Sequence, residues 1–254
     1  MRVQTCDEKH WQKFPNGRPK KHQVRQTLNA THAYARRVEV DWLIHIDVDE
    51  FLWPDKEVEH ELSALSDTVQ TARVRPIEQL SDAPDLYKAF IPPGPDRARI
   101  VEEIYPKFGQ YLKGGFLSHV AGKPFVRTGL GDLTVKIHNV FLDDVMNPGE
   151  AELAQVDLCH CHAKSWDAWV RTFRYRLSQG SYRAELGPAQ PQGVTLHEAL
   201  SRIEQDRGKA GLRAFFNEVC AATPELLQSL RDRDLLKRRV LGLEGKIRKH
   251  FPLN

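Results

Sequence analysis

The sequence predicts an α/β fold in which a mixed sheet is followed by a mainly helical C-terminal portion. Residues 42–46 form a short, β-rich apolar run of strand length, which favours a buried parallel strand at the centre of the sheet. Just before this run, residues 20–37 show apolar side chains recurring on one side at helical spacing. After Gly180 the chain is rich in charge, and its apolar residues again recur with a helical period.

The middle of the chain predicts short elements in alternation. Residues 57–70 are expected to form a short helix that leads into a strand at 71–80, which Pro76 would limit or end. The prolines and glycine of residues 81–100 predict a long irregular loop. Residues 104–129 alternate short apolar runs with glycines, which indicates β structure.

The C-terminal helices follow a segment rich in proline and glutamine, residues 185–195, which is predicted to be a linker. Thr195 is placed to cap the next helix. We therefore expect an α/β domain over residues 1–184 and a helical extension over residues 185–254.

Composition limits the function classes. The 254 residues carry a formal charge of only +3, so net charge gives little support to nucleic-acid binding. Basic residues gather in residues 18–25 and 235–251, which we interpret as solvated helical faces. The alternative is contact with an anionic glycan, a phosphate or a membrane surface. Lys123 and Arg127 are also interpreted as solvated surface residues, with contact to anionic substrate groups as the alternative.

The cysteine count and the apolar runs bear on the compartment. Four cysteines at irregular spacing do not make a disulfide scaffold, so reduced thiols are expected. The first residues lack an apolar signal core, and no apolar run approaches 18 residues. A cytoplasmic protein is the expectation.

Three carboxylates follow the apolar run of residues 42–46 within four positions. Asp47 and Asp49 are one residue apart at the predicted strand end, where both side chains can reach one hard cation. Oxygen ligands favour Mg²⁺ or Mn²⁺. The plainer interpretation of Asp47, Asp49 and Glu50 is a solvated strand end and turn.

The whole stretch of residues 26–51, QTLNATHAYARRVEVDWLIHIDVDEF, resembles nucleotide-sugar glycosyltransferases of the GT-A fold, in particular bacterial family 2 type members with an Asp-x-Asp-Glu-Phe motif. The resemblance implies that Asp47 and Asp49 hold a divalent ion, Mn²⁺ or Mg²⁺, against the donor diphosphate, with Glu50 behind them. It also implies that Gln26 and Asn29, on the preceding helix, contact the donor. Ordinary helix polarity is the alternative for these two residues.

A second stretch, residues 156–183, resembles the later His-Tyr-x-x-Lys-Ser segment of the same family. His160, Lys164 and Ser165 match, whereas Cys161 replaces the tyrosine. The resemblance implies that His160 completes the metal ligands and that Lys164 neutralises diphosphate charge. The implied function is metal-dependent transfer of a sugar from a nucleotide-sugar donor to a glycan or another acceptor.

Two other interpretations use the same residues of the second stretch. Cys159, His160, Cys161 and His162 could form a zinc site, but alternation along a strand sends the cysteines to one face and the histidines to the other. His160 could alternatively be a structural histidine bonded within the sheet.

The resemblance has departures. A GT-A domain begins with a strand, a helix and a second strand that grip the base, and this chain starts just before the motif helix. The resemblance therefore implies an incomplete, Rossmann-like mixed sheet over residues 1–184, which lacks the N-terminal nucleotide-binding part. An inactive relative that acts as a binding module is one alternative. No residue stands out as a catalytic base.

A phosphatase of the haloacid dehalogenase type is the alternative enzyme. In such an enzyme Asp47 would be the nucleophile and Asp49 the acid/base, with Mg²⁺ as the electrostatic clamp and residues 141–144 as the later acidic pair. Residues 50–55 lack the glycine-bearing turn of that family.

Overall fold

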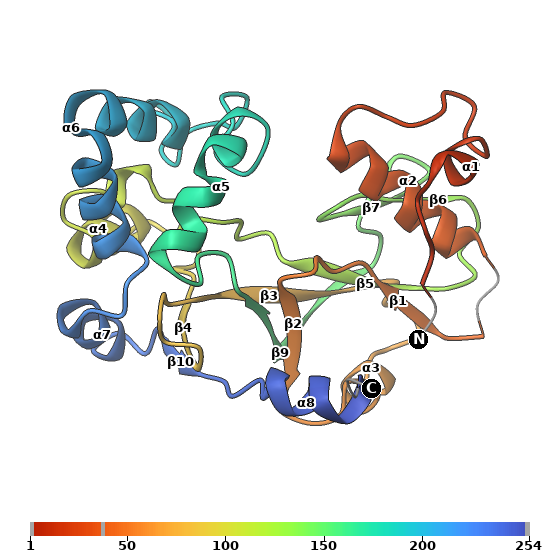
Figure 1. The fold of residues 1–254 in the computed structure, drawn as a ribbon. Coiled ribbons are helices and arrows are strands. Elements are labelled where there is room, and N and C mark those ends of the chain that lie inside the picture. The colour runs from red at the N-terminus through yellow and green to blue at the C-terminus, as the bar shows by residue number, and fades with distance from the viewer. Residues whose placement is uncertain (1–2, 37–38, 252–254) are drawn as a thin grey trace. The chain divides into compact units, whose positions relative to one another are not determined.

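The computed structural model describes residues 3–36 and 39–251, and over these ranges the chain is a mixed α/β protein (Figure 1). Its helices are α1 (Glu8–Trp11), α2 (His22–Ala35), α3 (Val58–Ser63), α4 (Arg97–Ile104), the 3₁₀ helix η1 (Gly109–Tyr111), α5 (Trp166–Ser178), α6 (Leu196–Val219), α7 (Pro224–Arg231) and α8 (Leu243–His250). Its strands are β1 (Trp42–Ile44), β2 (Glu50–Pro54), β3 (Thr71–Gln79), β4 (Leu86–Ala89), β5 (Lys123–Arg127), β6 (Leu133–Val135), β7 (Val140–Leu142), β8 (Val145–Met146), β9 (Glu150–His160) and β10 (Leu236–Arg238).

Most predicted helices are confirmed. The helices expected at residues 20–37 and 57–70 are α2 and α3, and the chain after Gly180 is mainly helical. The structure does not describe residues 1–2, 37–38 and 252–254. The predicted domains and the end of the first predicted helix extend into these residues.

The chain forms two compact units. The first takes its residues from 1–46, 59–74 and 123–153, and the second from 47–58, 75–122 and 154–254. Strands β3 and β9 each cross the boundary between these ranges. The division of the chain at residue 184 stays a prediction, which separate expression of the two segments would test.

The first unit holds β1, which is a strand as predicted but not a central parallel one. β1 pairs antiparallel with β5, Trp42 facing Arg127 in the register, and the strand order of the sheet ends at β1. Its residues are only half-buried, because a strand at the end of the order has a neighbour on one side. An apolar run of this length fits an edge strand as well as a buried parallel one. In this respect the prediction was wrong.

Helix α2 covers a small apolar core in the same unit. Ala30 and Tyr34 pack against Val126, Val135 and Val140, and the Tyr34 hydroxyl donates to the carbonyl of Arg127 at 3.0 Å. The three-stranded sheet β6–β7–β8 completes the unit. Ala30 and Tyr34 therefore form the packed face of α2, whereas Val24 and Ala35, apolar residues of the predicted helix, are exposed.

Two predictions for the middle of the chain were wrong. β3 continues through Pro76, which lies between the segment paired with β5, ending at Val74, and the segment paired with β4, beginning at Ile77. Proline has no backbone N–H, and neither register includes Pro76, so neither needs a hydrogen bond from it. Residues 81–100, predicted as a loop, contain β4 and the start of α4, because three of the four prolines and the glycine lie in the connection between these elements and Pro84 lies before β4.

Several basic residues that were predicted to be solvated are buried or paired instead. The Lys123 side chain is fully buried in β5, and Arg127 donates to the carbonyls of Val69 and Ser66 and stacks on Trp42. These contacts replace the solvation that was expected. The first part of the basic stretch at 235–251 is β10, which pairs antiparallel with β4. Only the later part, α8, is the solvated helix that was predicted.

The second unit has the larger core, which forms where α4, α5, α6 and α7 gather (Figure 1). Aromatic side chains dominate it, and Trp169 of α5 packs against Phe215 and Phe216 of α6. Residues 185–195 form turns and irregular structure before α6. No helix in the described ranges is both long and apolar enough to cross a bilayer.

The predicted cap of α6 is confirmed. The Thr195 hydroxyl accepts from the N–H of Glu198, and the Glu198 carboxylate accepts from the N–H of Thr195, which makes a reciprocal capping box. We expect Thr195→Ala to lower the free energy of unfolding by about 1 kcal/mol. Chemical denaturation would measure this change, and the exposed Thr172→Ala of α5 serves as the control. A loss no larger than that of the control would contradict the capping role.

Candidate functional site

The acidic motif forms a turn between strands rather than the end of a long strand. β1 stops at Ile44, and residues 45–49 lead through a turn into β2, which begins at Glu50. Glu50 closes this turn twice: its N–H donates to the carbonyl of Asp47 at 3.1 Å, and its Oε2 accepts from the N–H of Asp47 at 2.8 Å. Val48 at the tip is 99% exposed, whereas the Glu50 side chain is buried.

The pairing of β2 with β9 brings the two motif segments together. Glu50 lies directly opposite His160 in the antiparallel register, and directly opposed side chains point to the same face of a sheet. The N–H of Cys161 donates to the carbonyl of Asp49 at 2.8 Å, which holds the turn against the end of β9. As a result Asp49 Oδ2 lies 3.7 Å from His160 Nε2.

His119 joins this pair from a third segment. Its Nε2 lies 3.0 Å from Glu50 Oε1, and its ring centroid lies 5.1 Å from that of His160. The segment is fixed by the buried carboxylate of Glu78, which accepts from the N–H groups of Leu117 and Ser118. His119 is therefore held beside Glu50 by backbone contacts as well as by its own ring.

Glu50, His119 and His160 each offer one ligand atom, and these three atoms lie within 4.8 Å of one another. An ion with bonds of about 2.0–2.2 Å needs ligand atoms slightly closer than this, so small side-chain rotations would complete the site. The Nδ1 atom of His160 is buried and makes no hydrogen bond. A buried polar atom of this kind is normally satisfied, so the donor set and the geometry fit a divalent metal.

The ionised forms of Asp49 and His160 stabilise each other. Burial opposes the ionisation of Asp49, but the contact with His160 and its positive charge outweigh burial and lower the pKa of this carboxyl. Burial likewise opposes protonation of His160, while Asp49, Glu50 and Glu78 outweigh it and raise the pKa of the imidazole. The surroundings are thus negative, which also favours a bound cation.

His162 lies behind His160 and is held neutral. Its ring centroid lies 5.2 Å from that of His160, and its Nε2 meets the Tyr182 hydroxyl at 2.8 Å and Arg176 Nη1 at 3.2 Å. Arginine can only donate, so Nε2 accepts. Burial and the nearby Arg176 lower the pKa of His162 well below its usual value. This fixed ring supports His160 from one side.

The neighbouring cysteines point away from the site, as strand alternation predicts. Cys159 and Cys161 pack with Ile77 and Tyr87 in a separate apolar cluster. Burial raises the pKa of the Cys159 thiol to about 12, and this side chain faces the apolar cluster instead of the histidines. The arrangement does not favour a zinc site built from cysteines and histidines.

The predicted site residues fall in both units. Asp47, Asp49, His160 and Lys164 belong to the second unit, where Lys164 is exposed directly before α5. Gln26 and Asn29 belong to α2 in the first unit. There the Asn29 amide contacts His10 Nε2 at 2.9 Å and Cys6 Sγ at 3.4 Å.

His119 is the site residue that the sequence did not indicate. It stands in a segment of short apolar runs, FLSHVAGK, without a neighbouring acidic or histidine partner. Its partner Glu50 is 69 positions away. Glu50 was expected to lie behind the aspartates, and the structure places it among the three grouped ligand atoms.

Comparison of the chain with protein-family models, with curated proteins and with solved structures finds no match. The case for function therefore depends on the site and on the sequence resemblance alone.

Proposed function

We propose that this protein is a metal-dependent enzyme of glycosyltransferase type, which moves a sugar from a nucleotide-sugar donor to a glycan or another acceptor. One observation carries the proposal. The two stretches that resemble the family supply Asp49 and His160, and these side chains lie 3.7 Å apart although they are distant in the sequence. Chance proximity of both family positions is a weaker explanation than a shared site.

The ligands that we propose for the ion are Glu50, His119 and His160, with Asp49 beside them. Mixed carboxylate and imidazole ligands suit Mn²⁺ better than Mg²⁺, which prefers oxygen. In such an enzyme the ion supplies positive charge that stabilises the diphosphate as it leaves the sugar. Asp49, whose Oδ2 lies 3.7 Å from His160 Nε2, orients the imidazole.

Other residues have proposed roles around the donor. Lys164 is an exposed cation directly before α5, whose first turn is capped by Ser165, so a diphosphate there would meet both a cation and a helix N-terminus. Asp47 stays a proposed metal or donor contact, and Gln26 and Asn29 stay proposed donor contacts. We assign no catalytic base.

The proposal predicts that Mn²⁺ and a nucleoside diphosphate bind cooperatively. We expect uridine or guanosine diphosphate to tighten Mn²⁺ binding about tenfold or more, because phosphate oxygens add ligands to the ion. Isothermal titration calorimetry with and without each diphosphate measures the coupling. Lys164→Gln should weaken the coupling while leaving binding of Mn²⁺ alone unchanged, and Lys9→Gln, an exposed lysine of α1, is the control.

Turnover assays separate the alternatives. Release of the diphosphate from a panel of nucleotide sugars supports an active transferase, and coupled binding without release supports an inactive relative that acts as a binding module. Hydrolysis of p-nitrophenyl phosphate would favour a phosphatase. The proposal fails if no nucleoside diphosphate changes the affinity for Mn²⁺.

A further inference from the structure

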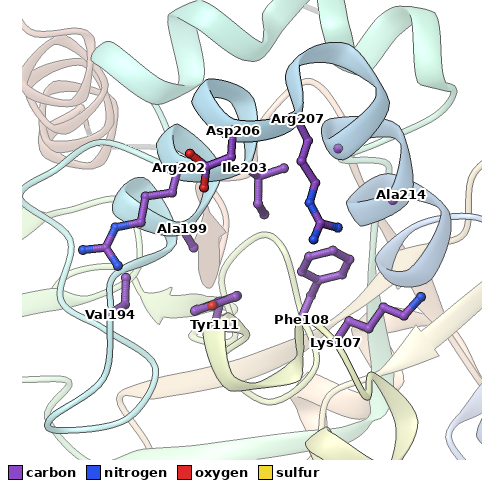
Figure 2. Close-up of a pocket in the computed structure, with 11 residues that line it drawn as sticks. Lys107, Phe108, Tyr111, Val194, Ala199, Arg202, Ile203, Asp206, Arg207 and Ala214 are labelled. Atoms are coloured by element: carbon purple, nitrogen blue, oxygen red, sulfur yellow. The ribbon is translucent and has the colours of Figure 1, made fainter.

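A pocket of about 590 Å³ lies away from the acidic motif, between α6 and the segment around η1 (Figure 2). All of its lining residues belong to the second unit. Its volume is in the range of sites for small ligands. None of the proposed metal or donor residues lines it.

The wall of the pocket depends on an interruption in α6. Gly208 has φ 54° and ψ −145°, which is a conformation that only glycine adopts readily, and it separates two helical segments. Arg202, Ile203 and Arg207 line the pocket before this kink, and Ala214 lines it after the kink. The two helical segments together therefore form one wall.

The opposite side of the pocket is aromatic and fixed in place. Phe108 and Tyr111 line it, and the Phe108 ring packs edge-on against the buried Phe215 with centroids 5.1 Å apart. The Glu218 carboxylate accepts from the backbone N–H groups of Lys107 and Phe108 at 2.8 and 2.9 Å. Two aromatic rings and Ile203 give a ligand an ordered apolar surface, which suits the carbon face of a ring.

The polar groups are divided between two ends of the pocket. Figure 2 shows Arg207 reaching from α6 toward Phe108, with Lys107 on the same side, and Arg202 and Asp206 on the other side near Val194. Within the described residues, the side chains of Arg207 and Lys107 make no ion pair or hydrogen bond. One end thus offers two cations for an anion, and the other offers a donor and an acceptor for neutral hydroxyls.

We propose that this pocket binds a phosphorylated sugar. The phosphate lies between Arg207 and Lys107, where the guanidinium can donate two hydrogen bonds to it. The sugar ring lies against Phe108 and Tyr111, and its hydroxyls meet Arg202 and Asp206. The Asp206 carboxylate disfavours a second anionic group at that end. This binding requires no turnover and no metal, so it stands apart from the proposed function.

The test is calorimetric titration of the whole chain with glucose 6-phosphate, with glucose, inorganic phosphate and uridine monophosphate as separate ligands. We expect glucose 6-phosphate to bind more tightly than the other three. Arg207→Gln with Lys107→Gln should weaken it roughly tenfold or more, because the phosphate then loses its charge-assisted hydrogen bonds to both cations. Arg171→Gln, an exposed arginine of α5 outside the pocket, is the matched control and should bind as the unchanged protein does.

Every other outcome counts against the proposal. Equal binding of inorganic phosphate would reduce the pocket to a simple anion site, and tighter binding of uridine monophosphate would show that it takes a base instead of a sugar. No binding of glucose 6-phosphate, or unchanged binding by the double variant, would overturn the assignment. The substituted side chains are exposed, so the double variant should fold, and circular dichroism would verify this.

Discussion

Replacement of Lys88 by methionine is expected to lower the free energy of unfolding by about 3–5 kcal/mol, the cost of leaving a buried charge without its partner. The Lys88 ammonium is buried and lies 3.1 Å from Glu78 Oε2. It also donates to the carbonyls of Gly115 and Val219, at 2.9 and 2.7 Å, and lies over the Tyr105 ring. Methionine is an unbranched side chain only one atom shorter than lysine, but it supplies none of the polar contacts of the ammonium.

Acid should reduce the difference between the two proteins. Burial opposes ionisation of Glu78, but Lys88 and the N–H groups of Ser118 and Leu117 outweigh it and lower the pKa of this carboxyl. The stability that Glu78 contributes is therefore present above the pKa of an unfolded glutamate and is lost as the pH falls through the lowered, folded value. In Lys88→Met the carboxylate lacks its cation and becomes protonated at higher pH, so the variant loses less on acidification.

Urea denaturation across pH measures both effects. Glu78→Gln in the Lys88→Met background should recover part of the loss, because neither charge then remains buried. A loss below about 1 kcal/mol for Lys88→Met at neutral pH would contradict this account of the pair, since it would match an exposed ion pair.

Loss of one proposed metal ligand should have the largest effect on binding. We expect His119→Ala and Glu50→Gln each to weaken Mn²⁺ binding by more than the roughly 10–100-fold that follows loss of a group behind the ligands. His119 is the sharper test, because it belongs to neither motif of the sequence resemblance. Electron paramagnetic resonance of free Mn²⁺ would give the affinities.

Two controls locate the site. His60→Ala removes an exposed histidine of α3 and should leave Mn²⁺ affinity unchanged. Cys159→Ala with Cys161→Ala tests the rival cluster and should also bind Mn²⁺ normally, since both thiols pack on the other side of β9. Retained binding by His119→Ala, or loss of binding by the cysteine variant, would contradict the assignment.

The helices could be predicted from the sequence because their signals are local. The apolar spacing of α2 and the Thr195 cap of α6 need only neighbouring residues. Strand partners are not local, so the antiparallel pairing of β1 with β5 could not be inferred from the residues of β1. The prediction that Pro76 would limit or end its strand was wrong for the same reason, because the effect of a proline depends on which strands pair with the residues around it.

The site could be predicted in part. Asp49 and His160 belong to the two stretches that the sequence singled out, and their side chains lie 3.7 Å apart, whereas an ion shared by both stays a prediction. His119 is a lone histidine whose meaning depends on a partner in a distant strand. The burial of Lys88 and Lys123 likewise could not be predicted from the sequence, because lysine is almost never fully buried unless it is paired.

The central claim is that Glu50, His119 and His160 hold one divalent ion. The most direct measurement is the anomalous scattering of Mn²⁺ in crystals of the whole chain grown with the ion. The account predicts one strong peak at about 2.0–2.3 Å from a ligand atom of each of these three residues. A peak bound only by Asp47 and Asp49, a peak at the cysteines, or no peak near His119 would contradict it.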